Sequence, residues 1–145
     1  MSTFHQTLKD IKSYIEDYME TFKEELEYEE LIIGEKARNP QTPTLWFIFG
    51  RSIIDPDALS STCELVRLTC SVVAMVEDRD VERGQDIAEQ LSLKATRKFL
   101  LDTTMNGLVS DVIRTAFVPS GTRVADKRVV HAAGVELEIR FYTED

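Results

Sequence analysis

The stretch of residues 64–76 constrains the fold more than any other part of the chain, because its side chains alternate in character. One face is wholly apolar and comprises Val66, Leu68, Cys70, Val72, Ala74 and Val76. The other face is mixed and comprises Leu65, Arg67, Thr69, Ser71, Val73 and Met75. This period of two predicts a β-strand that is covered on one side. About 13 residues exceed the usual strand length, so we expect the strand to bend, bulge or project at one end.

A helix is predicted directly after this strand, over residues 80–101. Asp80 can cap its N-terminus, and Glu82 lies in the first turn, where the helix dipole favours an acidic residue. Small and apolar residues recur at helical spacing and form one stripe, made of Val81, Gly84, Ala88, Leu91, Ala95 and Phe99. The stripe predicts that this helix folds back and packs against the strand.

The N-terminal segment predicts another helix, over residues 3–26. Its apolar stripe comprises Phe4, Leu8, Ile11, Ile15, Tyr18, Phe22 and Leu26. Residues 16–30 hold eight acidic residues and one basic residue, a net charge of −7 in a chain whose total is −9. Acidic residues oppose the dipole at the C-terminal end of a helix, so this end should fray or lie beside a basic group. The candidate acidic patch comprises Glu20, Glu24, Glu25, Glu27, Glu29 and Glu30.

The remaining elements are predicted to be strands of the same sheet. Residues 31–33 suggest a short strand, and the apolar run at residues 44–50 suggests a strand covered on both faces, with Trp46 in the core. Residues 108–118 read as a strand that is broken at residues 119–122, and residues 135–142 alternate as a final strand. The order predicts a single α+β domain over residues 1–145, with a mainly antiparallel sheet and both helices on one face.

The connection at residues 51–62 is long for a hairpin turn and apolar for a solvated loop. Its apolar side chains include Ile53, Ile54 and Leu59. Two interpretations remain open: a long loop that packs on its own domain, or a β-arm that packs on a neighbouring molecule.

Composition disfavours several classes of function. No apolar run approaches the roughly 20 residues of a membrane span, and the N-terminal residues lack the pattern of a secretory signal. We therefore expect a cytoplasmic protein without a membrane partner. The net charge of −9 disfavours broad nucleic-acid binding, because such binding depends on lysine and arginine neutralising phosphates.

The residues that usually carry catalysis are not arranged in any recognisable pattern. Two cysteines, Cys63 and Cys70, and two histidines, His5 and His131, do not make a zinc site. The six glycines stand apart, so no phosphate-binding loop is predicted. Neither histidine has an evident partner, and His131 is expected to be structural. We expect no catalytic residues, metal ligands or cofactor, and hence no enzyme.

The order of elements and several local segments carry a resemblance to a known family. These segments are the proline-preceded strand at residues 43–49, the long strand ending at residues 76–80, the Ala88-Glu89-Gln90-Leu91 segment of the central helix, and the small residues 132–134 before the last strand. With the N-terminal helix, they cover nearly the whole chain as a pattern. In these features the chain resembles the tail terminator proteins of long-tailed bacteriophages and related viruses, including their tail-completion relatives.

The resemblance implies a structural role in the virion. Such proteins form a ring, typically a homohexamer, at the head-proximal end of the tail tube. The ring ends tube growth and joins to the head connector. The implied partners are other copies of the chain, the tail tube protein and the head–tail connector protein, and DNA passes through the lumen without specific binding. The implied location is the virion tail, assembled in the host cytoplasm.

The candidate contact residues for such a ring lie on the 51–62 segment, the adjoining strand and a set of basic side chains. They are Arg51, Ile53, Ile54, Leu59, Cys63, Leu65, Arg67, Arg97, Arg123 and Arg128. We expect residues 72–76 to lie in the core and the 63–68 end of the strand to meet a neighbour. The alternatives are a small α+β binding module whose apolar loop covers a ligand, another head–tail joining (neck) protein, and an acidic mimic of nucleic acid.

Overall fold

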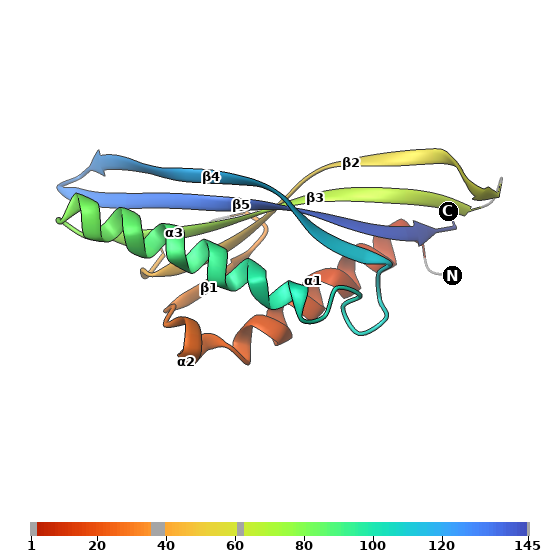
Figure 1. The fold of residues 1–145 in the computed structure, drawn as a ribbon, viewed down its shortest axis with the longest axis horizontal. Helices are drawn as coiled ribbons and strands as arrows, with labels where there is room; N and C mark the ends of the chain where they lie inside the picture. Colours follow the sequence, from red (N-terminus) through yellow and green to blue (C-terminus); the bar gives the residue numbers. More distant parts are fainter. Residues whose placement is uncertain (1–2, 36–39, 61–62, 145) are drawn as a thin grey trace.

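The computed structural model describes residues 3–35, 40–60 and 63–144, and within these ranges all side chains except those of residues 56–60 and 125. It consists of one five-stranded sheet with helices on one face (Figure 1). The elements are α1 (Phe4–Glu20), α2 (Lys23–Leu26), β1 (Glu30–Ile33), β2 (Thr44–Ser60), β3 (Cys63–Glu77), α3 (Val81–Arg97), a 3-10 turn (Lys98–Leu100), β4 (Asp111–Ala125) and β5 (Arg128–Thr143). This confirms the predicted α+β fold. No helix in the described ranges is long and apolar enough to cross a membrane.

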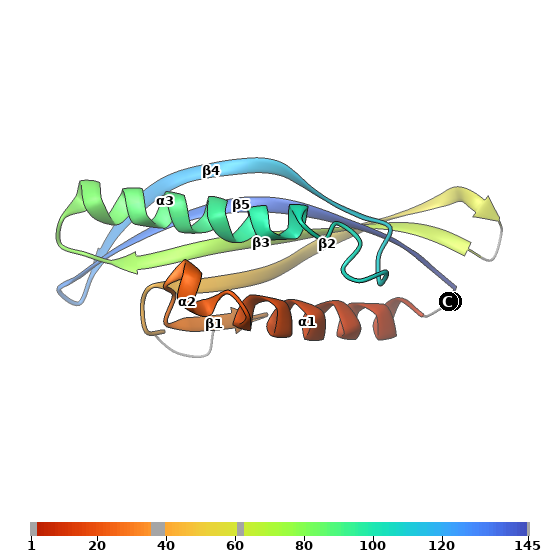
Figure 2. The same cartoon turned by 60° about the horizontal axis from the view of Figure 1, so that its bottom comes forward.

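The strand order in the sheet is β1-β2-β3-β5-β4. Only β1 pairs in parallel, with the start of β2, and all other neighbours are antiparallel. The β2–β3 hairpin and the β4–β5 hairpin therefore turn at opposite ends of an elongated sheet, while α1, α2 and α3 lie on the same face (Figures 1 and 2). We refer to the opposite face, which no described element covers, as the open face.

The alternation predicted for residues 64–76 is confirmed. Its apolar face is buried and points toward the helices. Pairing with β5 places Leu68 beside Ile139 and Cys70 beside Leu137, so both strands contribute the same face to the core. Cys63 and Cys70 are both buried, and they form no disulfide within the described residues.

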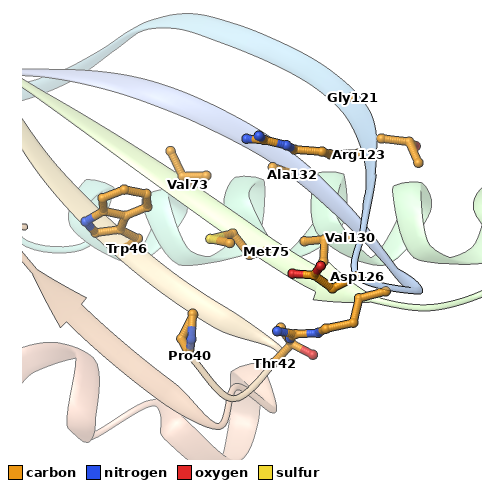
Figure 3. A pocket seen from close by; sticks show the side chains of 12 residues that line it. Pro40, Thr42, Trp46, Val73, Met75, Gly121, Arg123, Asp126, Val130 and Ala132 are labelled. Carbon is orange, nitrogen blue, oxygen red and sulfur yellow. The ribbon is translucent and has the colours of Figure 1, made fainter. Parts of the chain in front are cut away.

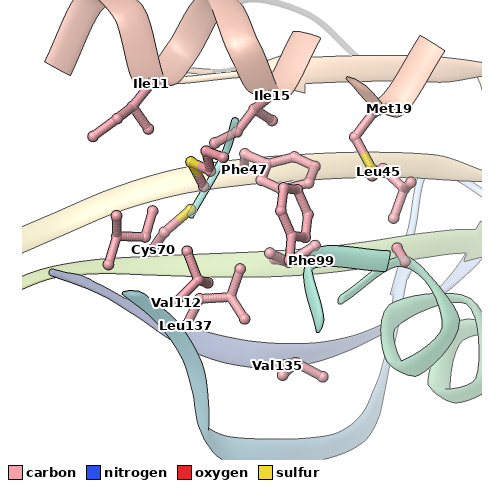
Figure 4. Close-up of a cluster of buried hydrophobic side chains, with 14 of the residues drawn as sticks. Ile11, Ile15, Met19, Leu45, Phe47, Cys70, Phe99, Val112, Val135 and Leu137 are labelled. Carbon is pink, nitrogen blue, oxygen red and sulfur yellow. The ribbon is translucent and has the colours of Figure 1, made fainter. Parts of the chain in front are cut away.

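The core is centred on Phe99, which follows α3 in the 3-10 turn. Its ring lies 5.5 Å from the ring of Tyr18 in α1 and 5.9 Å from that of Phe47 in β2. Phe99 is fully buried and so joins both helices to the sheet (Figure 4). Around it pack α1 residues that include Ile11 and Ile15, as the helical spacing predicted.

The N-terminal helix is shorter than predicted. It ends at Glu20, and the four-residue α2 that follows is closed by Glu27 in the left-handed region, at φ 59°. The acidic end does have a basic neighbour, because the ammonium of Lys98 lies 2.6 Å from the carboxylate of Glu25 and 4.7 Å from the centre of the Phe22 ring. The expectation of a basic group beside this end is therefore confirmed.

Helix α3 begins as predicted, because the side chain of Asp80 accepts a hydrogen bond from the backbone N–H of Arg83. Its stripe is buried from Gly84 to Ala95 and continues to Phe99. Val81 was wrongly placed in this stripe and is exposed. Burial begins only one turn later, where Gly84 lies against His131.

Two predicted interruptions are in fact parts of long strands. Residues 51–60 continue β2 as a strand rather than forming a loop, and residues 61–62 lie outside the described part. The contact of this segment with a neighbouring molecule stays a prediction. Residues 119–122 do not end β4. Each strand continues past the predicted interruption through a shift in register, at Phe49/Ser52 in β2 and at Val118/Gly121 in β4. At the second shift the Glu89 carboxylate accepts bonds from the backbone N–H and the hydroxyl of Ser120, which lowers the pKa of Glu89.

The expectation that the 63–68 end of β3 leaves the domain is wrong for its helix-facing side chains. Val66 and Leu68 are buried members of the core. They stay there because β5 pairs with β3 as far as Glu64, and because Phe4 at the start of α1 packs on Phe141, at 5.9 Å between ring centres. Only the β2 side of this hairpin is left bare.

Tyr28 should make the fold less stable at alkaline pH. Its buried hydroxyl donates a 2.9 Å bond to the carbonyl of Met19, and burial raises its pKa from 10.0 to about 12. The stabilisation is complete below about pH 10 and is lost as pH rises toward about 12, because the unfolded chain releases the proton first. Urea titrations across this pH range measure the effect. Below about pH 10 the free energy of unfolding of Tyr28→Phe should be about 1 kcal/mol lower than that of the wild type, and it should decrease less steeply as the pH rises. Equal slopes would contradict this role.

Candidate interaction surfaces

The hairpin end is defined here as residues 52–55 of β2, which include the exposed side chains of the β2–β3 hairpin, together with residues 64–67 of β3, which are half-buried or buried. Ile53 and Ile54 are 43% and 52% exposed. Consecutive residues of a strand point to opposite faces, and the register agrees, with Ile53 beside Arg67 on the open face and Ile54 beside Val66 on the helix side. The hairpin end therefore presents an isoleucine on each face.

On its helix side the hairpin end forms a hollow of about 600 Å³ against the start of α1. The hollow is lined by Ile54 and Glu64 together with Thr3, Phe4, His5, Ser52 and Thr143. Glu64 lies two residues from Val66, the partner of Ile54, so the two side chains share one face. This face therefore combines an exposed apolar side chain with an acidic one.

The open face carries a pocket of about 620 Å³ at the opposite end of the sheet, which we call the open-face pocket (Figure 3). Its apolar floor is contributed by three strands and comprises Trp46, Val73, Met75, Val130 and Ala132. Charged side chains at its edge are Arg123, Asp126 and Arg128, and Pro40, Thr42, Gly121 and Thr122 complete the lining. The pocket is thus an apolar surface with charged groups along the β4–β5 hairpin.

The charge at the edge of the open-face pocket is mainly positive. Residues 121–130 contain three basic residues and one acidic residue, a net charge of +2. The guanidinium of Arg128 lies 2.9 Å from the carboxylate of Glu77, which balances one of the positive charges. Arg123 is exposed and forms no ion pair with any residue in the described ranges. Among the basic residues that line the pocket, Arg123 is therefore the one without an ion pair in the described ranges.

Trp46 lies on the open face rather than in the core. Its indole N–H donates to the carbonyl of Gly34, which fixes the ring, and its side chain is half-buried. The expectation that β2 is covered on both faces is wrong, because all the helices pack on the other side. An all-apolar strand predicts that both of its faces are buried. It does not show whether a helix or only neighbouring side chains cover each face.

A buried histidine supports the pocket from the helix side. His131 is fully buried, its Nε2–H donates to the carbonyl of Asp78 at 2.8 Å, and its Nδ1 lies 2.8 Å from the hydroxyl of Thr122. Gln85 of α3 donates to the same hydroxyl at 2.7 Å. No partner of His131 was evident in the sequence, and the structure supplies Asp78 and Thr122, in keeping with the structural role expected of this residue. These bonds join β4, β5 and α3.

The loop before α3 is held by an ion pair beside this histidine. The guanidinium of Arg83 donates to the Asp78 carboxylate at 2.7 and 2.9 Å. These hydrogen bonds hold the pKa of Asp78 at about 2. The carboxylate stays charged under ordinary conditions, so the loop that carries the His131 acceptor keeps its conformation.

The structure separates the predicted contact residues into two main groups. Arg51, Ile53, Ile54, Leu65 and Arg67 lie at or beside the hairpin end, whereas Arg123 and Arg128 edge the open-face pocket. Arg97 lies apart from both, in a hollow near α2 that also contains Glu25 and Leu26. Cys63 is only 6% exposed and offers little surface. The side chain of Leu59 lies outside the described part.

The acidic patch follows the end of α1, the short α2 and the start of β1. Five of its glutamates are exposed and Glu30 is half-buried in β1. The Glu25 carboxylate is neutralised by Lys98, at 2.6 Å. The patch is therefore less uniformly negative than its sequence suggests.

Sequence reasoning missed the floor of the open-face pocket. Val73 and Met75 belong to the mixed face of residues 64–76, and their apolar character at one end of that face was the available signal. Val130 and Ala132 carried no such signal, because they precede the alternating part of β5.

The described part of the chain contains no group of three or more His, Cys, Asp or Glu side chains placed to hold a metal ion. Comparison with models of known protein families finds no match. A search of curated proteins likewise finds no relative.

Proposed function

We propose that this chain is a structural virion protein, a tail terminator that forms a ring, expected to contain six copies, at the head-proximal end of a viral tail tube. The ring ends polymerisation of the tube and joins to the head connector. The observation that carries this proposal is the hairpin end, where Ile53 and Ile54 are exposed on opposite faces of one strand. Burial of such side chains is worth about 25 cal/mol per Å² of apolar surface, which favours contact with another chain.

The arrangement of surfaces also supports a ring. The hairpin end and the open-face pocket are different surfaces at opposite ends of one sheet. Contacts between different patches of identical chains are heterologous, and such contacts generate closed rings when the rotation between copies closes. The element order resembles that of tail terminators and supports the same assignment.

The partners on either side of the ring would be the tail tube protein and the head–tail connector protein. The acidic patch supports passage of DNA without specific binding, because a negative surface that faced the lumen would repel phosphates. Location in the virion tail, after assembly in the host cytoplasm, belongs to the same proposal.

The proposal predicts a defined assembly. Mass measurement in solution, by light scattering or native mass spectrometry, should find a species of six times 16.6 kDa, about 100 kDa, either alone or after incubation with tail tubes. Added to polymerising tube protein, the chain should cap the tubes and shorten them, as seen by electron microscopy. A chain that remains monomeric at all soluble concentrations and leaves tube length unchanged would contradict the proposal.

A second candidate function is a small α+β binding module, which the open-face pocket favours. A pocket of about 620 Å³ with an apolar floor lies in the size range of ligand sites. If this function holds, a ligand library should yield compounds whose binding quenches Trp46 fluorescence in the monomer, and no capping of tubes should occur.

A further inference from the structure

We propose that the open-face pocket of one copy receives the hairpin end of a second copy, with Ile54 on the apolar floor and Glu64 beside Arg123. This inference rests on the proposed ring and names the contact that builds it. The occupant has to come from another molecule. Ile54 and Trp46 lie eight residues apart on the same strand, roughly 25 Å, and face opposite sides of the sheet.

The two surfaces match in apolar character. Ile54 is 52% exposed in the single chain, and the pocket offers Trp46, Val73 and Met75 to cover it. Apolar side chains that enter a neighbour's pocket are typical of interface hot spots. Because the surfaces lie on opposite faces and at opposite ends, one copy can use both at once, and the contact can repeat around a ring.

The two surfaces also match in charge. Residues 51–64 contain one basic residue and three acidic residues, a net charge of −2, against +2 for residues 121–130. Glu64 shares its face with Ile54, and Arg123 edges the pocket whose floor Ile54 would contact. Arg123 has no ion-pair partner among the described residues of its own chain. Complementary potentials of this kind set the register and the partner.

Charge reversal tests this pairing in the full-length chain. Glu64→Arg and Arg123→Glu should each raise the dissociation constant for assembly about tenfold or more, and the double variant should recover most of the loss. Arg114→Glu, on the same strand as Arg123 but outside the pocket, is the matched control and should assemble normally. If the double variant is no better than the singles, the pairing is wrong.

The isoleucines provide a second matched pair. Ile54→Ser should weaken assembly about tenfold or more, whereas Ile53→Ser, on the other face of the same strand, should not. Thermal unfolding of the monomers checks that both variants remain folded. Loss of assembly in Ile53→Ser alone would overturn the proposed orientation.

Cross-linking locates the contact directly. A chain carrying both Ile54→Cys and Arg123→Cys should give a ladder of covalent oligomers with a short bismaleimide, while each single variant and the wild type, whose cysteines are buried, should not. A wild-type ring without this ladder overturns the inference but leaves the proposed function standing. A wild-type chain that forms no ring and caps no tubes overturns the proposed function itself. Variants that form rings normally but fail to bind tubes would assign the hairpin end to the tube protein.

Discussion

Replacing Phe99 by alanine should lower the free energy of unfolding by about 3–5 kcal/mol, because it removes a fully buried aromatic ring and leaves a cavity. The ring contacts Tyr18 of α1 and Phe47 of β2, so the cavity would lie where both helices meet the sheet. The neighbouring elements are fixed by their own backbone bonds and can collapse into the space only in part. Urea unfolding followed by circular dichroism measures the loss.

The control for this variant is Leu101→Ala, two residues further along the chain. Leu101 is 72% exposed, so its truncation should change the free energy of unfolding by no more than about 0.5 kcal/mol. Equal effects of the two substitutions would show that Phe99 does not hold the helical layer on the sheet.

Replacing Gly84 by alanine should also destabilise the protein, by about 1–3 kcal/mol. Alanine normally stabilises a helix relative to glycine by about 1 kcal/mol. Here, however, a β-carbon would overlap the ring of His131 and touch the side chain of Asp78, at 3.0 Å. His131 cannot move aside without breaking its bonds to Asp78 and Thr122. The steric cost should therefore exceed the helix gain.

A double-mutant cycle separates this steric effect from other causes. His131→Ala removes the ring and is expected to destabilise the protein on its own, because the Asp78 carbonyl loses its side-chain donor and the Thr122 hydroxyl keeps only its bond from Gln85. In that background Gly84→Ala should become neutral or slightly stabilising, which gives a coupling energy of about 1–3 kcal/mol. Gly50→Ala, whose β-carbon would come no closer than 3.6 Å to another atom, is the control glycine. Simple additivity at positions 84 and 131 would contradict the packing argument.

The same contact links stability to the open-face pocket. Thr122 lines the pocket and is held by His131 and Gln85, so α3 fixes the position of β4 at the pocket edge. A variant that loosens this cluster should displace Arg123 and weaken assembly even though no contact residue has changed. Assembly measurements on the Gly84→Ala variant would therefore complement its unfolding data.

Local pattern determined much of the fold. The alternation at residues 64–76, the stripe of α3 and the alternating end of β5 each indicate which side of the element is buried, and apart from Val81 these assignments agree with the structure. Such periods arise from the geometry of one strand or one helix, so neighbouring residues are sufficient to read them. The capping role of Asp80 follows in the same way, because a cap acts within one turn.

Strand lengths were decided by tertiary contacts. Proline and glycine at residues 119–121 suggested the end of a strand, but β4 is an edge strand, where proline is tolerated. A register shift and the hydrogen bonds from Ser120 to Glu89 of α3 carry the strand past them. Glu89 lies 31 residues away, so no local window could reveal this support.

Of the two candidate surfaces, one could be predicted from the sequence and the other could not. The exposed isoleucines of residues 51–62 could be singled out from the sequence, because apolar residues in a connection need an explanation. The open-face pocket could not, since its floor joins residues of β2, β3 and β5 that only strand order and register bring together. The sequence by itself determined which faces of the strands are apolar. Only the tertiary structure decided the strand order and the register that place these residues side by side, because the pairing of strands distant in sequence depends on contacts that no local pattern encodes.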